Sequence, residues 1–205
     1  MSRSGTLLVF LKYPEPGKVK TRLAAILGTE VAANLYRDWI GMVLRNIQAV
    51  RPAIRIVGYW DGATVEHFAE WFPLVDDWLP QPTGDLGERL TFAFAWGHES
   101  GNPVLAIGTD CLDLRGDHLT DAIARLGDND AVFGPASDGG YYLVGTSRLG
   151  PGLFNGIRWS SAHTLADQLG RCETLGLRVS LLDELADIDT SDDWQAYQLR
   201  PGHCR

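Results

Sequence analysis

Lysine occurs in only one part of this chain, a segment rich in proline and glycine close to the N-terminus. The lysines are Lys12, Lys18 and Lys20, and the other fifteen basic residues are arginines. A lysine ammonium is a compact charge on a flexible stem, which suits a phosphate that moves or changes charge. The apolar run 7–11 comes before the segment and a helical pattern follows it, which predicts a strand–loop–helix junction. A helix N-terminus itself favours anions. The loop is therefore predicted to bind an anion, with a solvated basic loop as the alternative.

Three aspartates in two later segments are candidates for a metal site. Asp110 follows the apolar run 103–108, and Asp187 and Asp189 alternate after the last predicted strand. This alternation puts both carboxylates of the pair on the same side of an extended segment. Mg²⁺ takes oxygen ligands and usually completes its shell with water and substrate phosphates. Asp110 with one or both of the pair would neutralise a diphosphate or triphosphate from the side opposite the lysines. The alternative for Asp110 is a turn or helix cap.

Apolar runs with strand character alternate with amphipathic segments along almost the whole sequence. This order predicts an α/β fold with a mostly parallel sheet, whose ligand crevice lies beyond the carboxyl ends of the strands. Both the lysine loop and Asp110 fall at such ends. The irregular segment 147–159 is predicted to be a mobile substrate loop. The predicted strands are 7–11, 53–59, an edge strand within 73–80, 103–108, 130–135, 141–145 and 177–182. The predicted helices begin after residue 20 and cover 29–50, 62–72, 85–98, 117–126, 160–175 and a terminal segment after Thr190.

Composition limits the classes of protein that this chain can belong to. A length of 205 residues with 45% hydrophobic residues predicts a single domain, 1–205, with one sizeable core. The net charge of −8 argues against nucleic acid as a partner, and local positive charge then favours a small anionic ligand. Cys111, Cys172 and Cys204 lack metal-ligand spacing and are predicted to be reduced thiols of a cytoplasmic protein. The run 7–11 is too short for a signal peptide, and no stretch is long enough to span a membrane.

Six sequence motifs are spread over nearly the whole chain. They are Phe10-x-Lys12-x-Pro14-x-Pro16-Gly17-x-Val19-Lys20-Thr21-Arg22-Leu23, Gln81…Gly84-Asp85-Leu86-Gly87-x-Arg89, Gly108-Thr109-Asp110-Cys111, Gly134-Pro135-Ala136-x-Asp138-Gly139-Gly140-Tyr141-Tyr142-Leu143, Trp159-Ser160 and Asp187-Ile188-Asp189-Thr190. As a set they resemble the DUF2064 family, also labelled the arsenosugar-biosynthesis-type glycosyltransferase family, within the nucleotide-diphospho-sugar transferases. That family is similar to 2-phospholactate guanylyltransferases and, more distantly, to molybdenum-cofactor nucleotidyltransferases. The resemblance implies a GT-A-like fold, a three-layer αβα sandwich.

The resemblance also implies roles for single residues. It implies a Mg²⁺ or Mn²⁺ ion with Asp110 as its principal ligand and with Asp187 and Asp189 completing the site. Two departures from the family pattern are Leu112, where proline is usual, and Ser161, where threonine is usual; neither removes a charged group. The implied catalytic residues are Lys20, Arg22 and Asp110; the implied nucleotide and phosphate ligands are Lys12, Pro16, Gly17, Lys18, Thr21, Gly84, Asp85 and Arg89; the implied acceptor ligands are Asp138, Gly139, Gly140 and Tyr141.

The function expected from the sequence is a metal-dependent transferase with a nucleotide donor and a small-molecule acceptor. Glycosyl transfer from a nucleoside diphosphate-sugar is preferred, and nucleotidyl transfer to a small phosphorylated acceptor is the alternative. A catalytically silent nucleotide-binding module is a third possibility, against which the three aspartates argue. A NAD-dependent enzyme is excluded because the first strand–helix turn lacks the G-x-G-x-x-G pattern. The sequence offers no convincing general base.

Overall fold

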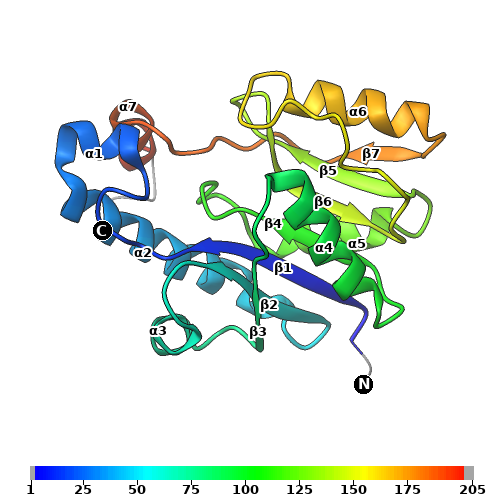
Figure 1. Cartoon of the computed structure of the whole chain (residues 1–205), viewed down its shortest axis with the longest axis horizontal. Coiled ribbons are helices and arrows are strands. Elements are labelled where there is room, and N and C mark those ends of the chain that lie inside the picture. The colour runs from blue at the N-terminus through cyan, green and yellow to red at the C-terminus, as the bar shows by residue number, and fades with distance from the viewer. Residues whose placement is uncertain (1–2, 201–205) are drawn as a thin grey trace.

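The computed structural model describes residues 3–200, so Cys204 lies outside the described part. Its strands form one seven-stranded sheet in the order β3-β2-β1-β4-β6-β5-β7 (Figure 1). Every neighbouring pair is parallel except those made by β6, which is antiparallel to both β4 and β5. The mostly parallel mixed sheet is thus confirmed. The strands are β1 (Gly5–Lys12), β2 (Ile54–Asp61), β3 (Asp77–Pro80), β4 (Val104–Ile107), β5 (Ala131–Pro135), β6 (Tyr141–Thr146) and β7 (Val179–Leu181).

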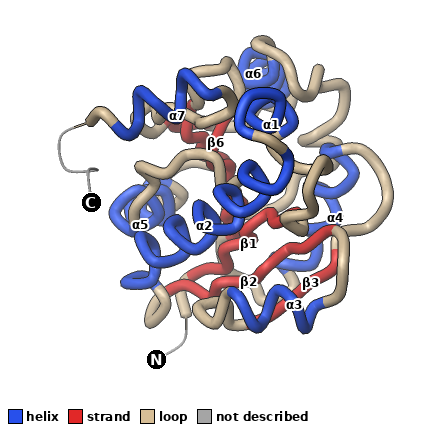
Figure 2. Tube along the Cα trace, turned by 90° about the vertical axis from the view of Figure 1, so that its left-hand side faces the viewer, coloured by secondary structure: helices blue, strands red, loops and turns tan. Residues whose placement is uncertain are grey.

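Helices cover both faces of the sheet and complete the three-layer sandwich. Side chains of α2, α3, α5 and α7 pack into one core, and those of α4 and α6 pack into the core on the other face. Figure 2 shows α2 alongside β1 and β2. The helices are α1 (Thr21–Leu27), α2 (Thr29–Ile47), α3 (Val65–Trp71), α4 (Leu86–His98), α5 (Gly116–Arg125), α6 (Thr164–Thr174) and α7 (Ser191–Gln198), with a 3₁₀ turn, η1 (Gln48–Val50), after α2.

The pattern of apolar residues explains this layering. In β1, Leu7 and Leu11 belong to the core on one face and Leu8 to the core on the other, because successive side chains of a strand point to opposite faces. A strand with helices on both faces is expected to be mostly apolar, as β4 is throughout and β1 is from Leu7 to Leu11. In α2, buried side chains recur from Ala32 to Ile47 at helical spacing. No helix within residues 3–200 combines the length and the apolar character needed to cross a membrane.

Two local predictions need correction. Helix α6 begins at Thr164 rather than at a serine cap, because the Ser161 hydroxyl donates to the Arg158 carbonyl and accepts from the His163 N–H in a preceding turn. The segment 147–159 contains no strand or helix, as predicted, but it is well packed. Leu153 and Phe154 are only 1% and 2% exposed. Such burial argues against a freely mobile loop.

Candidate active site

Lys20 occupies a special position between the lysine loop and α1. It is the N-cap residue of α1 and has left-handed backbone dihedrals, φ 45° and ψ 48°. A non-glycine residue in this region is uncommon and carries strain. The conformation accompanies an inward-directed side chain, of which only 6% is exposed. The structure therefore buries one of the three loop lysines and leaves the Lys18 side chain largely exposed, in an ion pair with Glu15.

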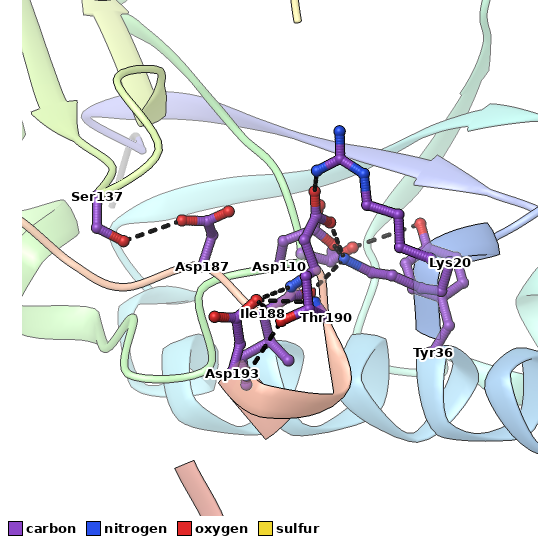
Figure 3. A network of polar contacts seen from close by, with 11 residues as sticks. Lys20, Tyr36, Asp110, Ser137, Asp187, Ile188, Thr190 and Asp193 are labelled. Carbon is purple, nitrogen blue, oxygen red and sulfur yellow. Dashed lines mark hydrogen bonds and ion pairs between the residues drawn. The ribbon is translucent and has the colours of Figure 1, made fainter. Parts of the chain in front are cut away.

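The buried ammonium lies between two of the predicted metal-binding carboxylates (Figure 3). Lys20 Nζ is 2.9 Å from Asp110 Oδ1 and 3.0 Å from Asp189 Oδ1. It also donates a hydrogen bond to the Ile188 carbonyl oxygen at 2.6 Å. Arg22 lies 3.5 Å from the other oxygen of Asp189. Burial alone lowers the pKa of Lys20, but the charges of Asp110 and Asp189 more than offset it, so the pKa is raised and the ammonium stays protonated.

Backbone contacts bring the two carboxylates to this ammonium. Asp110 follows β4, and its carbonyl oxygen accepts a hydrogen bond from the Ile188 N–H at 3.0 Å. Asp189 is tied to the start of α7, where its N–H donates to the Asp193 carboxylate. Thr190 and Asp193 form the predicted capping box of this helix. Residues more than 160 positions apart, Lys20 and Asp189, are thus fixed by the first helix and the last.

A cavity of about 290 Å³ lies at the lysine loop. Its wall holds all three lysines together with Thr21, Arg22, Tyr36, Asp110 and Asp189. Pro16 and Gly17 do not line it; Gly17 has φ 81° and serves the loop's turn. Four cations converge on one cavity with two carboxylates at its edge, a charge arrangement suited to phosphate groups. The lysine loop and Asp110, predicted separately from the sequence, therefore belong to one site.

A second cavity of about 280 Å³ shares Asp110 and Asp189 with the first. Among the described residues its lining includes Asp138, Gly140, Tyr141, Trp159 and Asp187 but no lysine, arginine or histidine. Burial, and then the nearby charges of Asp138 and Asp189, raise the pKa of Asp187. The Ser137 hydroxyl donates to Asp187 at 3.1 Å. Figure 3 shows Asp187 next to Ser137 and apart from Lys20.

Two of the predicted acceptor ligands serve the local backbone. Gly139 has φ 87°, and a Cβ there would lie 2.4 Å from the Ala162 carbonyl oxygen. Glycine is needed at this position for the close packing of two loops. Asp138 accepts a hydrogen bond from the Gly140 N–H at 2.7 Å, which closes a turn before β6. Gly139 does not line the second cavity, whereas Asp138, Gly140 and Tyr141 do.

The three predicted metal ligands do not converge on one point. Within residues 3–200, no group of three or more histidine, cysteine or acidic side chains is arranged to hold a metal ion. Asp110 and Asp189 share the Lys20 ammonium, and Asp187 faces the second cavity. The donor chemistry nevertheless fits a hard cation, because both shared carboxylates are oxygen donors with 45% and 42% of their side chains exposed. These two residues would hold a Mg²⁺ or Mn²⁺ ion, with water and phosphate completing its shell.

Gly84, Asp85 and Arg89 do not line these two cavities and have structural partners, whereas Leu86 of the same motif lines the second cavity. Asp85 caps α4 through a capping box with Glu88, as the sequence predicts. The Arg89 guanidinium donates to Asp61 at 3.3 Å, to the Gln81 side chain at 3.1 Å and to the Gly84 carbonyl at 3.1 Å. A nucleotide contact for these residues therefore remains a prediction.

Tyr36 is a site residue that sequence reasoning missed. It lies on the buried face of α2, as a core residue would, yet it also lines the first cavity, here called the cationic cavity. Its hydroxyl accepts from the Lys12 backbone N–H at 3.3 Å and from the Thr109 hydroxyl at 3.5 Å. Burial and the charge of Asp110 raise the pKa of this phenol. Cys111, in contrast, is a buried thiol, and burial raises its pKa, which favours the protonated, less reactive form.

The fold is an α/β fold of the nucleotide-diphospho-sugar transferase type. The chain belongs to the DUF2064 family, described as uncharacterised proteins conserved in bacteria, whose model matches residues 43–161. A provisionally assigned nucleotide-diphospho-sugar transferase from Desulfovibrio desulfuricans G20, solved at 1.90 Å, is 32% identical, with a TM-score of 0.89 over 100% of this chain and 91% of that one. No protein of curated function matches the chain.

More distant structures share the fold alone. The CMP:2-keto-3-deoxy-manno-octonic acid synthetase complexed with CTP is 10% identical, with a TM-score of 0.57, over 95% of this chain and 97% of that one. The protein Rv0371C from Mycobacterium tuberculosis H37Rv, in complex with manganese, is 15% identical, with a TM-score of 0.53, over 95% and 98%.

Proposed function

We propose that this protein is a metal-dependent glycosyltransferase that moves a sugar from a nucleoside diphosphate-sugar to an uncharged, hydroxyl-bearing acceptor. The observation that carries the proposal is the distribution of charge over two adjoining cavities. One is lined by Lys12, Lys18, Lys20 and Arg22, and the other by carboxylates, with Asp110 and Asp189 on the wall of both. A diphosphate in the first would place its sugar toward the second. The 32% identical relative, provisionally assigned as a nucleotide-diphospho-sugar transferase, supports this donor class.

The second cavity, which we assign to the acceptor, has a charge that argues against a phosphorylated acceptor. Asp138 and Asp187 line it, and no described residue on its wall carries a positive charge. Two unit charges of like sign about 5 Å apart, at an effective dielectric of about 20, repel by roughly 3 kcal/mol. A sugar or other polyol avoids that cost, because its hydroxyls donate hydrogen bonds to carboxylates. Trp159 supplies an apolar ring to the same wall.

The proposed reaction assigns roles to the residues of this chain. The acceptor hydroxyl oxygen forms a bond to the anomeric carbon while the bond from that carbon to the diphosphate oxygen breaks. The electron pair leaves with the nucleoside diphosphate, whose negative charge the Lys20 and Arg22 side chains stabilise. The proton of the acceptor hydroxyl passes to the Asp187 carboxylate, which lines the second cavity. Asp110 and Asp189 would hold a Mg²⁺ or Mn²⁺ ion, which would supply further positive charge at the leaving group.

Nucleotidyl transfer is the second candidate. It is favoured by the buried position of the Lys20 ammonium, since charge develops on the α-phosphate in such a reaction and a fixed lysine stabilises it. The likeness in fold to a synthetase complexed with CTP agrees with it. The two candidates differ in the bond that breaks, so the products separate them: a nucleoside diphosphate in one case and pyrophosphate in the other.

The test is a thermal-shift panel of nucleoside triphosphates and nucleoside diphosphate-sugars with and without Mn²⁺, followed by product analysis. We expect Mn²⁺-dependent stabilisation by one class of diphosphate-sugar, of about 3 kcal/mol at roughly a hundredfold excess over Kd. Asp110→Ala should lose this Mn²⁺-dependent stabilisation. Asp38→Ala, which removes an exposed carboxylate of α2, should retain it. Stabilisation that ignores both Mn²⁺ and Asp110 would favour a binding module, and pyrophosphate release would favour nucleotidyl transfer.

A further inference from the structure

We propose that Lys20 is the resident cation of the Asp110–Asp189 pair, so that a divalent ion binds there only when a nucleotide phosphate draws the lysine away. The inference rests on the proposed function and adds a form of regulation to it: metal and nucleotide bind with positive coupling. Lys20 is then more than a phosphate ligand, because in the absence of nucleotide it competes with the metal.

The contacts of Lys20 leave no room for a second cation between the same oxygens. An ammonium has three N–H donors, and here all three directions are taken: Asp110 Oδ1 at 2.9 Å, Asp189 Oδ1 at 3.0 Å and the Ile188 carbonyl at 2.6 Å. A metal ion bound by both carboxylates would lie within a few ångströms of this charge. A divalent ion and the Lys20 ammonium at such a distance repel each other by several kcal/mol, even at an effective dielectric of about 20.

The local charge balance points the same way. Asp110 and Asp189 carry two negative charges, and Lys20 with Arg22, which is 3.5 Å from Asp189, carries two positive charges. The ligand-free pair is therefore already neutralised and attracts a further cation weakly. A diphosphate in the cationic cavity would change this balance, because it offers Lys20 new anionic partners on the wall that the lysine already lines. Removal of the ammonium would leave the two carboxylates free for a metal ion.

This exchange has a thermodynamic consequence. If nucleotide binding raises the affinity for metal, metal binding must raise the affinity for nucleotide by the same factor. The exchange is local, since rotation about the side-chain bonds of Lys20 moves the ammonium without moving α1.

The test measures Mn²⁺ binding to the full chain without nucleotide, by electron paramagnetic resonance of free Mn²⁺. Lys20→Met removes the competing charge and should bind Mn²⁺ at least tenfold more tightly than the wild type. Lys20→Gly is the second variant, because glycine adopts the left-handed backbone of this position without strain and so guards against misfolding. Arg45→Met, which removes an exposed cation of α2, is the matched control for the change in net charge and should leave Mn²⁺ affinity unchanged.

A second measurement addresses the coupling itself. UDP and GDP serve as probes, at free Mn²⁺ concentrations fixed by a buffer. In the wild type, Mn²⁺ should raise the affinity for the preferred diphosphate. In Lys20→Met, the ratio of the affinities with and without Mn²⁺ should fall toward one. Equal or weaker Mn²⁺ binding by both Lys20 variants would overturn the inference. Neither measurement involves turnover, so a protein that binds Mn²⁺ as expected but transfers no sugar would contradict the proposed function alone.

Discussion

At the scale of single residues, the Tyr36 hydroxyl connects the lysine loop to the segment that carries Asp110. It accepts hydrogen bonds from the Lys12 N–H, in a partly buried environment, and from the Thr109 hydroxyl, in a buried one. Tyr36→Phe removes the acceptor and leaves two donors without it. Because an unsatisfied buried donor costs about 1–3 kcal/mol, we expect the free energy of unfolding to fall by about 1 kcal/mol in urea titrations. The affinity for the nucleotide should also fall, because Lys12 loses its anchor.

Tyr59→Phe is the matched control for this prediction. The Tyr59 hydroxyl donates to the Arg89 carbonyl at 2.9 Å, away from the cationic cavity. Tyr59→Phe should lower the free energy of unfolding by a similar amount and leave nucleotide affinity unchanged. If both variants weaken nucleotide binding equally, the loss follows from lower stability, and Tyr36 has no positioning role.

At the scale of elements, the start of α4 offers a clear test of a predicted nucleotide contact. Asp85 accepts from the Glu88 N–H at 2.9 Å, and Glu88 accepts from the Asp85 N–H at the same distance. Asp85→Ala should lower the free energy of unfolding by about 1 kcal/mol, as for other lost N-caps. Asp85→Asn should retain most of the cap, because asparagine is an equally good N-cap residue.

The same two variants separate capping from ligand binding. If Asp85 only caps α4, both variants should bind nucleotide like the wild type in titration calorimetry. A large loss of affinity in Asp85→Asn, with stability nearly unchanged, would show that its charge acts on the ligand. That result would confirm the role implied by the family resemblance.

The other end of α4 makes stability depend on pH. His98 Nδ1 lies 3.2 Å from the Asn102 carbonyl and Nε2 lies 2.8 Å from the Thr146 hydroxyl, an arrangement that a neutral ring satisfies. Burial lowers the pKa of His98 below its usual value of 6.5. As the pH falls through 6.5 the unfolded chain takes up the proton first, so stability decreases until the folded-state pKa is passed. We expect the wild type to lose more stability than His98→Gln between pH 7.5 and 5.5.

This pH effect is checked by urea titrations at both pH values. His67→Gln, on the exposed surface of α3, should retain the pH dependence of the wild type. A pH dependence that survives in His98→Gln would mean that other groups cause it.

The elements were largely predictable from the sequence, because their signals are local. Alternating apolar faces, capping boxes and glycine or proline boundaries lie within a few residues of the structure that they determine. The start of α6 was predicted wrongly, since Ser161 forms its bonds in a separate turn. The ion pair of Lys20 was not predictable, because it joins residues 90 and 169 positions apart through the topology of the sheet. Tyr36 was missed because a buried helical position carries no sign of function.

At the scale of the whole molecule, the site depends on the return of the chain after β7. In Figure 1 this segment crosses back to α7, which lies beside α1. It delivers Asp187 and Asp189 to the loops after β1 and β4. The rings of Trp194 in α7 and Trp39 in α2 lie 5.1 Å apart, and Lys20 Nζ lies 5.5 Å from the Trp39 ring. The contact between Trp194 and Trp39 therefore connects the last helix to the ring that packs against Lys20.

Trp194→Ala should consequently impair the site more than the fold. Because Trp194 is only partly buried, the expected loss of stability is about 2 kcal/mol, below the roughly 3–5 kcal/mol of a fully buried tryptophan. Loosening α7 frees Asp189, so Mn²⁺-dependent nucleotide binding should fall at least tenfold in calorimetry.

Trp96→Ala is the control: Trp96 is also partly buried and contacts Arg55, but it lies on α4, on the opposite face of the sheet. It should cost similar stability and spare binding. Equal losses of binding in both variants would mean that the site follows global stability, and that α7 does not hold it in place.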